Sequence, residues 1–491
     1  MMHDRGKSDR VVVPQKPPNN PVEPGAEAVE GRTRPKGNSP TRRAVRTQGR
    51  EAASQALGRV RQAARAKRDQ RFTALLHHVD DQTRLHAAYL ALKRDAAAGI
   101  DGETWQHYGE PLEAHLQDLA DRVRRGAYRA QPVRRTFIPK ADGRQRPLGV
   151  PTREDKIVQR AVVEVLKAMY EPAFLGFSYG FRPGRSPHQA LEALSVGLMR
   201  RRVNWVLDAD IRGFFDPLDH GWLVRFLEHR IGDRRIVRLI QKWLRAGVLD
   251  QGTRIVSEVG TVQGGSISPL RANVYLHYVF DLWIHRWRRR HARGQVIVVR
   301  YADDFVVGFE HRDDAERCLT ELRARVAQFG LALHSDKTRL LEFGRYAADR
   351  RRARGVGKPE TVNFLGFTHS GGTTRKGGFT VRRQTMRQRW QAKLREVKLQ
   401  LQRRRHHALR DQGTYLRAVF VGHLRYYGVP MNGPALSVFR GALARLWYRA
   451  LRRRSQRTRV TATRMRRYVA QWLPAARICH PYPLHRFAVM T

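Results

Sequence analysis

Two short apolar stretches that carry aspartates constrain this chain more than any other feature. Residues 205–211 are apolar except for two acids near their end. Residues 296–299 and 305–309 flank the sequence Tyr-Ala-Asp-Asp at 301–304. Short runs rich in β-branched and aromatic residues predict strands, and the acidic pair between the last two runs predicts a tight turn. We therefore expect one strand that ends in acids and one hairpin that carries two acids at its tip.

The adjacent carboxylates at the hairpin tip need a positive partner, because like charges this close repel each other. Mg²⁺ prefers carboxylate oxygens together with substrate phosphates. Asp-Asp is also common as plain turn chemistry, so the turn alone leaves both interpretations open. The strand that ends at Asp210 favours the metal, because with Asp303 and Asp304 it can place three carboxylates around one metal pair.

Three further blocks of sequence carry a family resemblance. They are Phe-Ser-Tyr-Gly-Phe-Arg-Pro-Gly-Arg-Ser-Pro at 177–187, Gln-Gly-Gly-Ser-Ile-Ser-Pro-Leu at 263–270 and Phe-Leu-Gly-Phe at 364–367. With them the chain resembles the reverse transcriptases, and most closely the reverse transcriptase/maturases encoded within bacterial group II introns. The match runs from about Arg71 to the C-terminus, and the blocks are specific together although each alone is weak.

The resemblance implies an α+β right-hand polymerase fold followed by an all-α domain. We expect a disordered basic arm at 1–55, helical fingers at 56–200, a palm with a small antiparallel sheet and the catalytic site at 201–370, and a thumb with a maturase RNA-binding domain at 371–491. The apolar spacing from Phe72 onward predicts that the helical part begins there. Many relatives carry a nuclease domain rich in Cys and His after this point, and we expect none after Thr491.

The resemblance also assigns the metal site. Asp210, Asp303 and Asp304 would hold two Mg²⁺ ions, for which Mn²⁺ can substitute, and Ile211 is counted with them as a metal-binding position. Asp208 lies on the same strand face as Asp210. We prefer Asp210 as the ligand because Asp210-Ile211-x-x-x-Phe215 has the spacing of the family.

The same resemblance assigns contacts to the incoming nucleotide. Lys140 and Arg146 would clamp its triphosphate, since a point charge and a planar fork suit phosphate groups. Gln263 would contact the nucleotide as well. Phe215 would exclude the 2′-hydroxyl of a ribonucleotide, with a plain core aromatic as the alternative. Lys337 would give a proton to the leaving pyrophosphate, with a salt-bridged surface lysine as the alternative.

Two further sets of residues are assigned to the nucleic acid. A turn that presses on the end of the primer, the primer grip, would consist of Phe364, Leu365 and Gly366. RNA would be bound by arginines in the 177–187 block and near the C-terminus, namely Arg182, Arg185, Arg452, Arg453 and Arg454.

The charge of the chain agrees with a polyanionic partner. Lys and Arg total 94 against 44 Asp and Glu, a formal net charge of +50, and self-repulsion of that size destabilises a compact protein unless a polyanion offsets it. Residues 371–491 contain only two acids, Glu396 and Asp411, so this segment is basic throughout. No apolar run has the length of a membrane span. Cys318 and Cys479 belong to no metal-binding spacing.

We therefore predict an RNA-directed DNA polymerase that copies intron RNA into DNA and assists intron splicing and mobility as a maturase. Its partners would be group II intron RNA, an RNA template with a DNA primer, deoxynucleoside triphosphates and a DNA target. A cytoplasmic, nucleoid-associated location fits this prediction. Two alternatives stay open: a reverse transcriptase recruited to a retron-like or phage-defence role, and a splicing maturase whose polymerase is vestigial.

Overall fold

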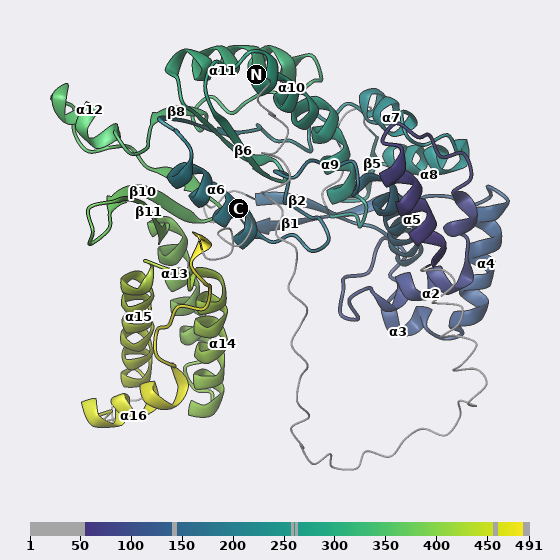
Figure 1. The fold of residues 1–491 in the computed structure, drawn as a ribbon. Coiled ribbons are helices and arrows are strands. Elements are labelled where there is room, and N and C mark those ends of the chain that lie inside the picture. Colours follow the sequence, from purple (N-terminus) through teal and green to yellow (C-terminus); the bar gives the residue numbers. More distant parts are fainter. Residues whose placement is uncertain (1–54, 140–144, 257–259, 261–263, 455–459, 485–491) are drawn as a thin grey trace.

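The structure is a computed structural model of the 491-residue chain (Figure 1). It describes residues 55–139, 145–256, 260, 264–454 and 460–484. The predicted basic arm, apart from its last residue, lies outside the described residues. Lys140 and Gln263 lie outside them as well, so their predicted contacts with the nucleotide remain predictions.

The N-terminal part is helical, as predicted, but the helical part does not begin at Phe72. Residues 72–79 form only one 3₁₀ turn, at Leu76–His78, and Phe72 pairs its main chain with the segment around Ile231. The Asp233 carboxylate accepts the N–H groups of both Leu75 and Leu76, and this long-range cap replaces the hydrogen bonds of a helix. The helices of this part are one over residues 55–66, where the helical part begins, and α2 (Gln82–Leu90), α3 (Trp105–Tyr108), α4 (Leu112–Arg124) and α5 (Arg153–Tyr170).

A small sheet extends from this helical part toward the centre of the molecule (Figure 1). Its strand order is β2-β1-β4-β5, and β1 pairs antiparallel with β2. Strands β1 and β2 carry Arg134, Arg135 and Arg146, and this antiparallel pair is called the basic hairpin below. The strands are β1 (Val133–Pro139), β2 (Gln145–Val150), β4 (Val248–Asp250) and β5 (Thr253–Ile255).

The central sheet has the strand order β6-β7-β3-β8, with every neighbouring pair antiparallel. Both of its faces are covered, by α11 and the α9–α10 segment on one side and by α6 on the other (Figure 1). The strands are β3 (Trp205–Asp210), β6 (Val296–Tyr301), β7 (Asp304–Phe309) and β8 (Arg339–Glu342). The helices around it are α6 (Pro187–Arg200), α7 (His220–Glu228), α8 (Arg234–Arg245), α9 (Ser268–Leu276), α10 (Leu282–Arg290), α11 (Arg312–Ala327) and α12 (Ala347–Ala353).

Side-chain alternation divides the core between the two faces of this sheet. Leu207, Phe305 and Val307 belong to the large core that also includes the N-terminal helices. Val206 and Val306 belong to a second core, on the opposite face, together with the residues around the third sheet. Because successive residues of a strand point to opposite faces, the acids at positions 208, 210 and 304 lie on the face of this second core.

The third sheet joins the central sheet to the C-terminal helices. Its order is β11-β10-β9, formed by β9 (Val362–Phe364), β10 (Phe367–Thr373) and β11 (Phe379–Thr385), and α6 packs against β11. The predicted domain boundary at 370 falls inside β10. Ser186 begins α6 with a capping box that it shares with Gln189, and Pro187 occupies the first turn, where proline costs no hydrogen bond.

The C-terminal part is a bundle of helices with a core of its own, set apart from the N-terminal helices at the other end of the molecule (Figure 1). Its helices are α13 (Arg387–Arg403), α14 (Leu409–Tyr427), α15 (Gly433–Arg452) and α16 (Ala462–Trp472). Their inner faces bury large apolar side chains, among them Phe420, Phe439 and Trp447. Within the described residues no helix has the length and apolar character needed to cross a membrane. Helices and small sheets together give the α+β class that the sequence predicted.

Candidate active site

Strand pairing brings the three predicted metal-binding acids together. Asp210, at the end of β3, lies directly opposite Asp304, the first residue of β7, and Asp304 pairs with Tyr301 of β6. The turn between β6 and β7 is therefore formed by Ala302 and Asp303, and Ala302 has a left-handed backbone with φ of 57°. The predicted hairpin with two acids at its tip is confirmed.

The acids at this turn repel one another. Partial desolvation, followed by repulsion from Asp303, Asp210 and Asp208, raises the pKa of Asp304 to about 7. Burial, with repulsion from Asp210, also raises the pKa of Asp303. Carboxylate oxygens that resist ionisation in this way are a donor set suited to a hard divalent cation, whose charge would offset the repulsion.

The side chains as arranged do not yet form a closed ligand set. Among the described residues, no group of three or more His, Cys, Asp or Glu side chains is placed to hold a metal ion. The Asp210 carboxylate is paired with the Lys337 ammonium at 2.5 Å. A metal at this edge would therefore compete with that ammonium for Asp210. Ile211 is buried and apolar, so only its main-chain carbonyl is able to bind a cation.

Asp208 differs from Asp210 in its partners. It pairs across β3 and β7 with Val306 rather than with the turn, and its carboxylate lies 3.6 Å from the Arg339 guanidinium. Burial raises its pKa to about 6, against the effect of Arg339. This position agrees with the preference for Asp210 as the metal-binding acid.

Lys337 lies beside the acids although more than 30 residues separate it from the turn in sequence. The segment that precedes it runs alongside the end of β3, because the His334 N–H donates to the Asp210 carbonyl at 2.8 Å. The ammonium is about half exposed. The ion pair that was the alternative for Lys337 is present, and proton donation by Lys337 stays a prediction.

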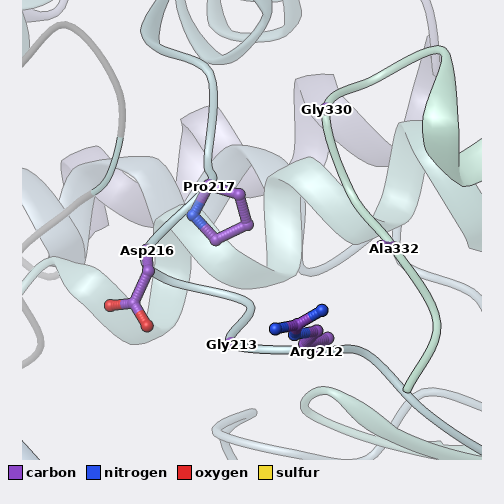
Figure 2. Close-up of a pocket in the computed structure, with 6 residues that line it drawn as sticks. All are labelled: Arg212, Gly213, Asp216, Pro217, Gly330 and Ala332. Atoms are coloured by element: carbon purple, nitrogen blue, oxygen red, sulfur yellow. The ribbon is translucent and has the colours of Figure 1, made fainter. Parts of the chain in front are cut away.

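The turn after β3 has the sequence Arg-Gly-Phe-Phe-Asp at 212–216, and it places its two phenylalanines in different environments. Phe214 is buried in the core, whereas Phe215 is half-buried and packs edge-on against it at 5.1 Å between ring centroids. Phe214 is thus the core aromatic, and the ring of Phe215 remains partly accessible. Beside this turn lies a cavity of about 380 Å³, shown in Figure 2 and lined by Arg212, Gly213, Asp216, Pro217, Gly330 and Ala332.

Arg146 is exposed on β2, and its charge acts on Asp303, whose pKa it lowers against the effect of burial. The Gly-Gly loop approaches the same strand: a Cβ at Gly264 would lie 2.5 Å from the Gly149 carbonyl oxygen, and its φ is +122°. Only glycine fits this approach. The basic hairpin, the Gly-Gly loop and the acidic turn therefore converge on one region.

The predicted primer grip is a tight turn between β9 and β10. Leu365 and Gly366 both have positive φ, at 48° and 79°, and Phe364 is buried beneath them. Tyr426 of α14 donates its hydroxyl to the Leu365 carbonyl at 2.9 Å. The turn is therefore fixed to the C-terminal bundle.

Two histidines that were not predicted as functional residues contact the C-terminal end of α14. His188, at the start of α6, is within 2.8 Å of the Tyr426 carbonyl through its Nε2, and its ring stacks on that of His480 at 3.8 Å. Nothing in the local sequence pattern marks this pair, because its members are almost 300 residues apart.

Two predicted RNA-binding arginines make contacts within the fold. Arg182 is buried, and its guanidinium donates to the Glu171 carboxylate and to the carbonyls of Leu175, Ser178 and Glu171. This geometry does not fit the prediction that Arg182 contacts RNA. Arg185 is half-buried, donates to a main-chain carbonyl and lies over the Tyr179 ring.

The three arginines near the C-terminus divide into two kinds. Arg452 and Arg453 are exposed at the end of α15. Arg454 donates to the His406 and His407 carbonyls and so holds the connection between α13 and α14. The first two keep their prediction as RNA-binding residues, and Arg454 has a role in the fold.

Sequence reasoning missed the buried residue that holds the acidic turn, Arg300. The sequence does mark Arg300 as unusual, because it is a charged residue in an otherwise apolar strand, directly before Tyr-Ala-Asp-Asp. Its partners, described below, come from distant segments.

Parts of this chain are similar in sequence to known proteins. The sequence profile of the family described as reverse transcriptase (RNA-dependent DNA polymerase) matches residues 138–369. Protein YkfC of Escherichia coli K12 is 33% identical over 285 residues, which cover 51% of this chain and 74% of YkfC. The group II intron-encoded protein LtrA of Lactococcus lactis is 37% identical over 226 residues, or 45% of this chain and 37% of LtrA. A 91 kDa protein in the cob intron of Schizosaccharomyces pombe is 32% identical over 223 residues, or 44% of this chain and 27% of that protein.

The match thus spans about three quarters of YkfC and a little over a third of LtrA. The profile match over residues 138–369 includes both acidic elements, the Gly-Gly loop and the turn at 364–367. The chain belongs to the reverse transcriptase family, among the group II intron reverse transcriptase/maturases.

Proposed function

We propose that this protein is an RNA-directed DNA polymerase that copies intron RNA into DNA and also assists intron splicing as a maturase. The observation that carries the proposal is the pairing of Asp210 with Asp304 at the end of the central sheet, next to Asp303. In the terms of a right-hand polymerase, the helices α2–α5 with the β1–β2 hairpin act as fingers, the central sheet as the palm and α13–α16 as the thumb and maturase domain.

The acids of the turn would hold two Mg²⁺ ions in the polymerase reaction. When bound, such a pair activates the primer 3′-oxygen and stabilises the pyrophosphate that leaves. The contribution of the chain is position: Asp210 comes from β3, and Asp303 and Asp304 come from the hairpin tip. Lys337 lies beside Asp210, where its ammonium is able to give a proton to the leaving group.

The nucleotide would lie between the acidic turn and the basic hairpin. Arg146 and Lys140 would bind its triphosphate, and Gln263, next to the Gly-Gly loop, would contact it. The approach of Gly264 to Gly149 supports this arrangement, because it brings the loop to the strand that carries Arg146.

Substitution of Phe215 by Val is expected to admit ribonucleotides. The ring packs on Phe214 and remains partly accessible, so shortening it opens space where the sugar 2′-hydroxyl would lie. Discrimination between a deoxynucleotide and the matching ribonucleotide should fall by about tenfold or more, since contacts of this size are worth about 1–3 kcal/mol. Single-nucleotide extension measures it. Phe214→Leu, a change in the buried neighbour, is the control. Unchanged discrimination in Phe215→Val would contradict the proposal that Phe215 excludes ribonucleotides.

RNA binding should weaken steeply as the salt concentration rises. Each phosphate neutralised by an arginine or lysine releases condensed counterions, with a slope of about −0.7 to −0.9 per contact on a plot of log affinity against log salt. With exposed arginines on the C-terminal bundle and the basic hairpin, a slope steeper than about −4 is expected. Filter binding of the intron RNA measures it, and a nearly flat plot would show that the positive charge is not used for RNA.

The test of the polymerase proposal is extension of a DNA primer on an RNA template with deoxynucleoside triphosphates and Mg²⁺. The wild-type protein should extend the primer, and removal of Mg²⁺ by EDTA should stop extension. A wild-type protein that binds RNA and promotes splicing, but does not extend primers under any Mg²⁺ concentration, would support the vestigial-polymerase alternative instead.

A further inference from the structure

Arg300, at the end of β6, is fully buried and makes five hydrogen bonds, as many as its guanidinium has N–H groups. Two of them, at 2.6 Å each, form a bidentate pair with the Asp281 carboxylate, which is also fully buried. The others go to the Asn273 side-chain oxygen at 3.2 Å, to the Ser178 hydroxyl at 2.7 Å and to the Ala302 carbonyl at 2.8 Å. One guanidinium thus joins the acidic turn to two other segments, the helix that carries Asn273 and Asp281 and the segment that carries Ser178.

A widened helical turn brings two of these partners to one side. Between α9 and α10 the helix has a π-helical turn at His277–Asp281. In a regular α-helix, Asn273 and Asp281 would be about 80° apart around the axis, because eight residues exceed two turns of 3.6. One residue absorbed in the wider turn brings them close to alignment. Both side chains are therefore able to reach Arg300.

The third segment lies along the free edge of β6. The main chain of Arg300 donates to the Phe177 carbonyl at 2.9 Å and accepts from the Tyr179 N–H at 2.8 Å. The next residue, Gly180, approaches the acidic turn so closely that a Cβ there would lie 2.3 Å from the Ala302 nitrogen. Its carbonyl accepts from the Asn273 amide at 2.8 Å, so the three segments are also bonded to one another.

A buried ion pair by itself is poor evidence for stability, since well-packed apolar side chains often stabilise a core as well. A guanidinium adds a fixed planar geometry, which a lysine ammonium does not. Here that geometry is applied to the carbonyl of Ala302, a residue held in the left-handed region that alanine rarely adopts.

We propose that Arg300 and Asp281 form a positioning pair that fixes the Ala302–Asp303 turn, and with it the orientation of the two catalytic carboxylates. The inference rests on the proposed polymerase function and adds residues that touch neither substrate nor metal. Asn273 and Ser178 complete the frame by accepting from two of the three remaining donors of the guanidinium, and the Ala302 carbonyl accepts from the third.

The test compares Asp281→Asn and Arg300→Lys with a matched control, Asp233→Asn. Asp233 is also a buried carboxylate paired with an arginine, but its other partners are the main-chain N–H groups of Leu75, Leu76 and Arg235. Amide hydrogen exchange of the metal-free proteins is the first readout. In Asp281→Asn and Arg300→Lys, exchange in peptides that cover residues 298–306 should become about tenfold faster or more. In Asp233→Asn, the faster exchange should appear in residues 72–79 and leave 298–306 unchanged.

The second readout is the Mg²⁺ concentration that gives half-maximal primer extension. It should rise by about tenfold or more in the two test variants, as for other residues that orient metal-binding groups, and stay at the wild-type value in Asp233→Asn. RNA affinity should change by less than about twofold in all three. Ser178→Ala removes one of the five bonds and keeps the ion pair, so it should shift both readouts in the same direction by less, even if Asp281→Asn fails to fold.

The positioning role would be overturned if Arg300→Lys and Ser178→Ala both behaved like the control Asp233→Asn. In that case, their amide exchange in residues 298–306 and their half-maximal Mg²⁺ concentration would both equal those of the control. Failure of the polymerase proposal would look different. In that case the wild-type protein would not extend primers, while the exchange readout would still decide whether the pair fixes the turn.

Discussion

Substitution of Asp304 by Asn is expected to abolish primer extension while leaving the protein folded and at least as stable as the wild type. Metal ions in such sites supply several kcal/mol of charge stabilisation, so the loss of one ligand should lower the rate by about a thousandfold or more. The substitution keeps the shape of the side chain. RNA affinity should remain near the wild-type value, because the turn acids serve the metal rather than the grip on RNA. Extension and filter binding on the same preparation measure both effects.

The stability part of this prediction has a defined pH dependence. The folded-state pKa of Asp304 is raised to about 7, above the value of about 3.9 for an unfolded chain, so folding favours its protonated form. The ionised form therefore lowers the free energy of unfolding as pH rises from about 4 through about 7, and this penalty is fully present above about pH 7. The amide that replaces the carboxyl group in the variant cannot ionise. In EDTA, the melting temperature of Asp304→Asn minus that of the wild type should be larger at about pH 8 than at about pH 5.

Asp349→Asn, at an exposed acid on α12, is the control for both measurements and should change neither extension nor this difference. Retained extension in Asp304→Asn would contradict the assignment of the catalytic acids. A difference in melting temperature that shrinks as pH rises would contradict the repulsion at the turn.

Separation of splicing from DNA synthesis is the second large expected effect. Asp303→Ala should lose primer extension but still promote splicing of the intron RNA, because the C-terminal bundle has only two acids and is not expected to use the catalytic metals. Conversely, the double variant Arg452→Glu and Arg453→Glu should lose splicing assistance and about ten- to a hundredfold in RNA affinity at physiological salt, since phosphate contacts dominate such affinity. It should still extend a primer on a short template.

The structure refines which arginines this test should change. Arg452 and Arg453 are exposed at the end of α15, just beyond the buried Leu451, so charge reversal there leaves the bundle core intact. Arg454 is left unchanged because it supports the fold through the His406 and His407 carbonyls. Arg352→Glu, at an exposed arginine of α12, is the matched control for charge reversal. Failure of folded Asp303→Ala to promote splicing, or normal splicing by the double variant, would contradict the two-function proposal.

The sequence by itself determined the elements whose pattern is local. The strand that ends at Asp210 and the hairpin with Asp303 and Asp304 at its tip each follow from periodicity and turn chemistry within about ten residues, whereas the turn at Leu365 and Gly366 follows from the family resemblance. The joint occurrence of the sequence blocks also identified the family. These features can be predicted from the sequence because backbone geometry restricts which residues fit at a turn or along a strand.

Only the tertiary structure decided which side chains meet across long sequence distances. The 3₁₀ turn at 76–78 replaces the expected helix because Asp233, more than 150 residues away, accepts its N–H groups. Arg182 resembles an RNA-binding arginine in sequence, yet its guanidinium is buried and makes four hydrogen bonds inside the fold.

The same holds for the support of the acidic turn. The five bonds of Arg300 depend on a π-helical turn and on a glycine that lets another segment approach, and no local pattern encodes their coincidence. Burial removes water as a competing partner, so a buried guanidinium takes whichever acceptors the packing brings to it. Those acceptors are set by the packing of whole elements, and for this reason the sequence indicated the acids of the turn while only the fold showed what holds them.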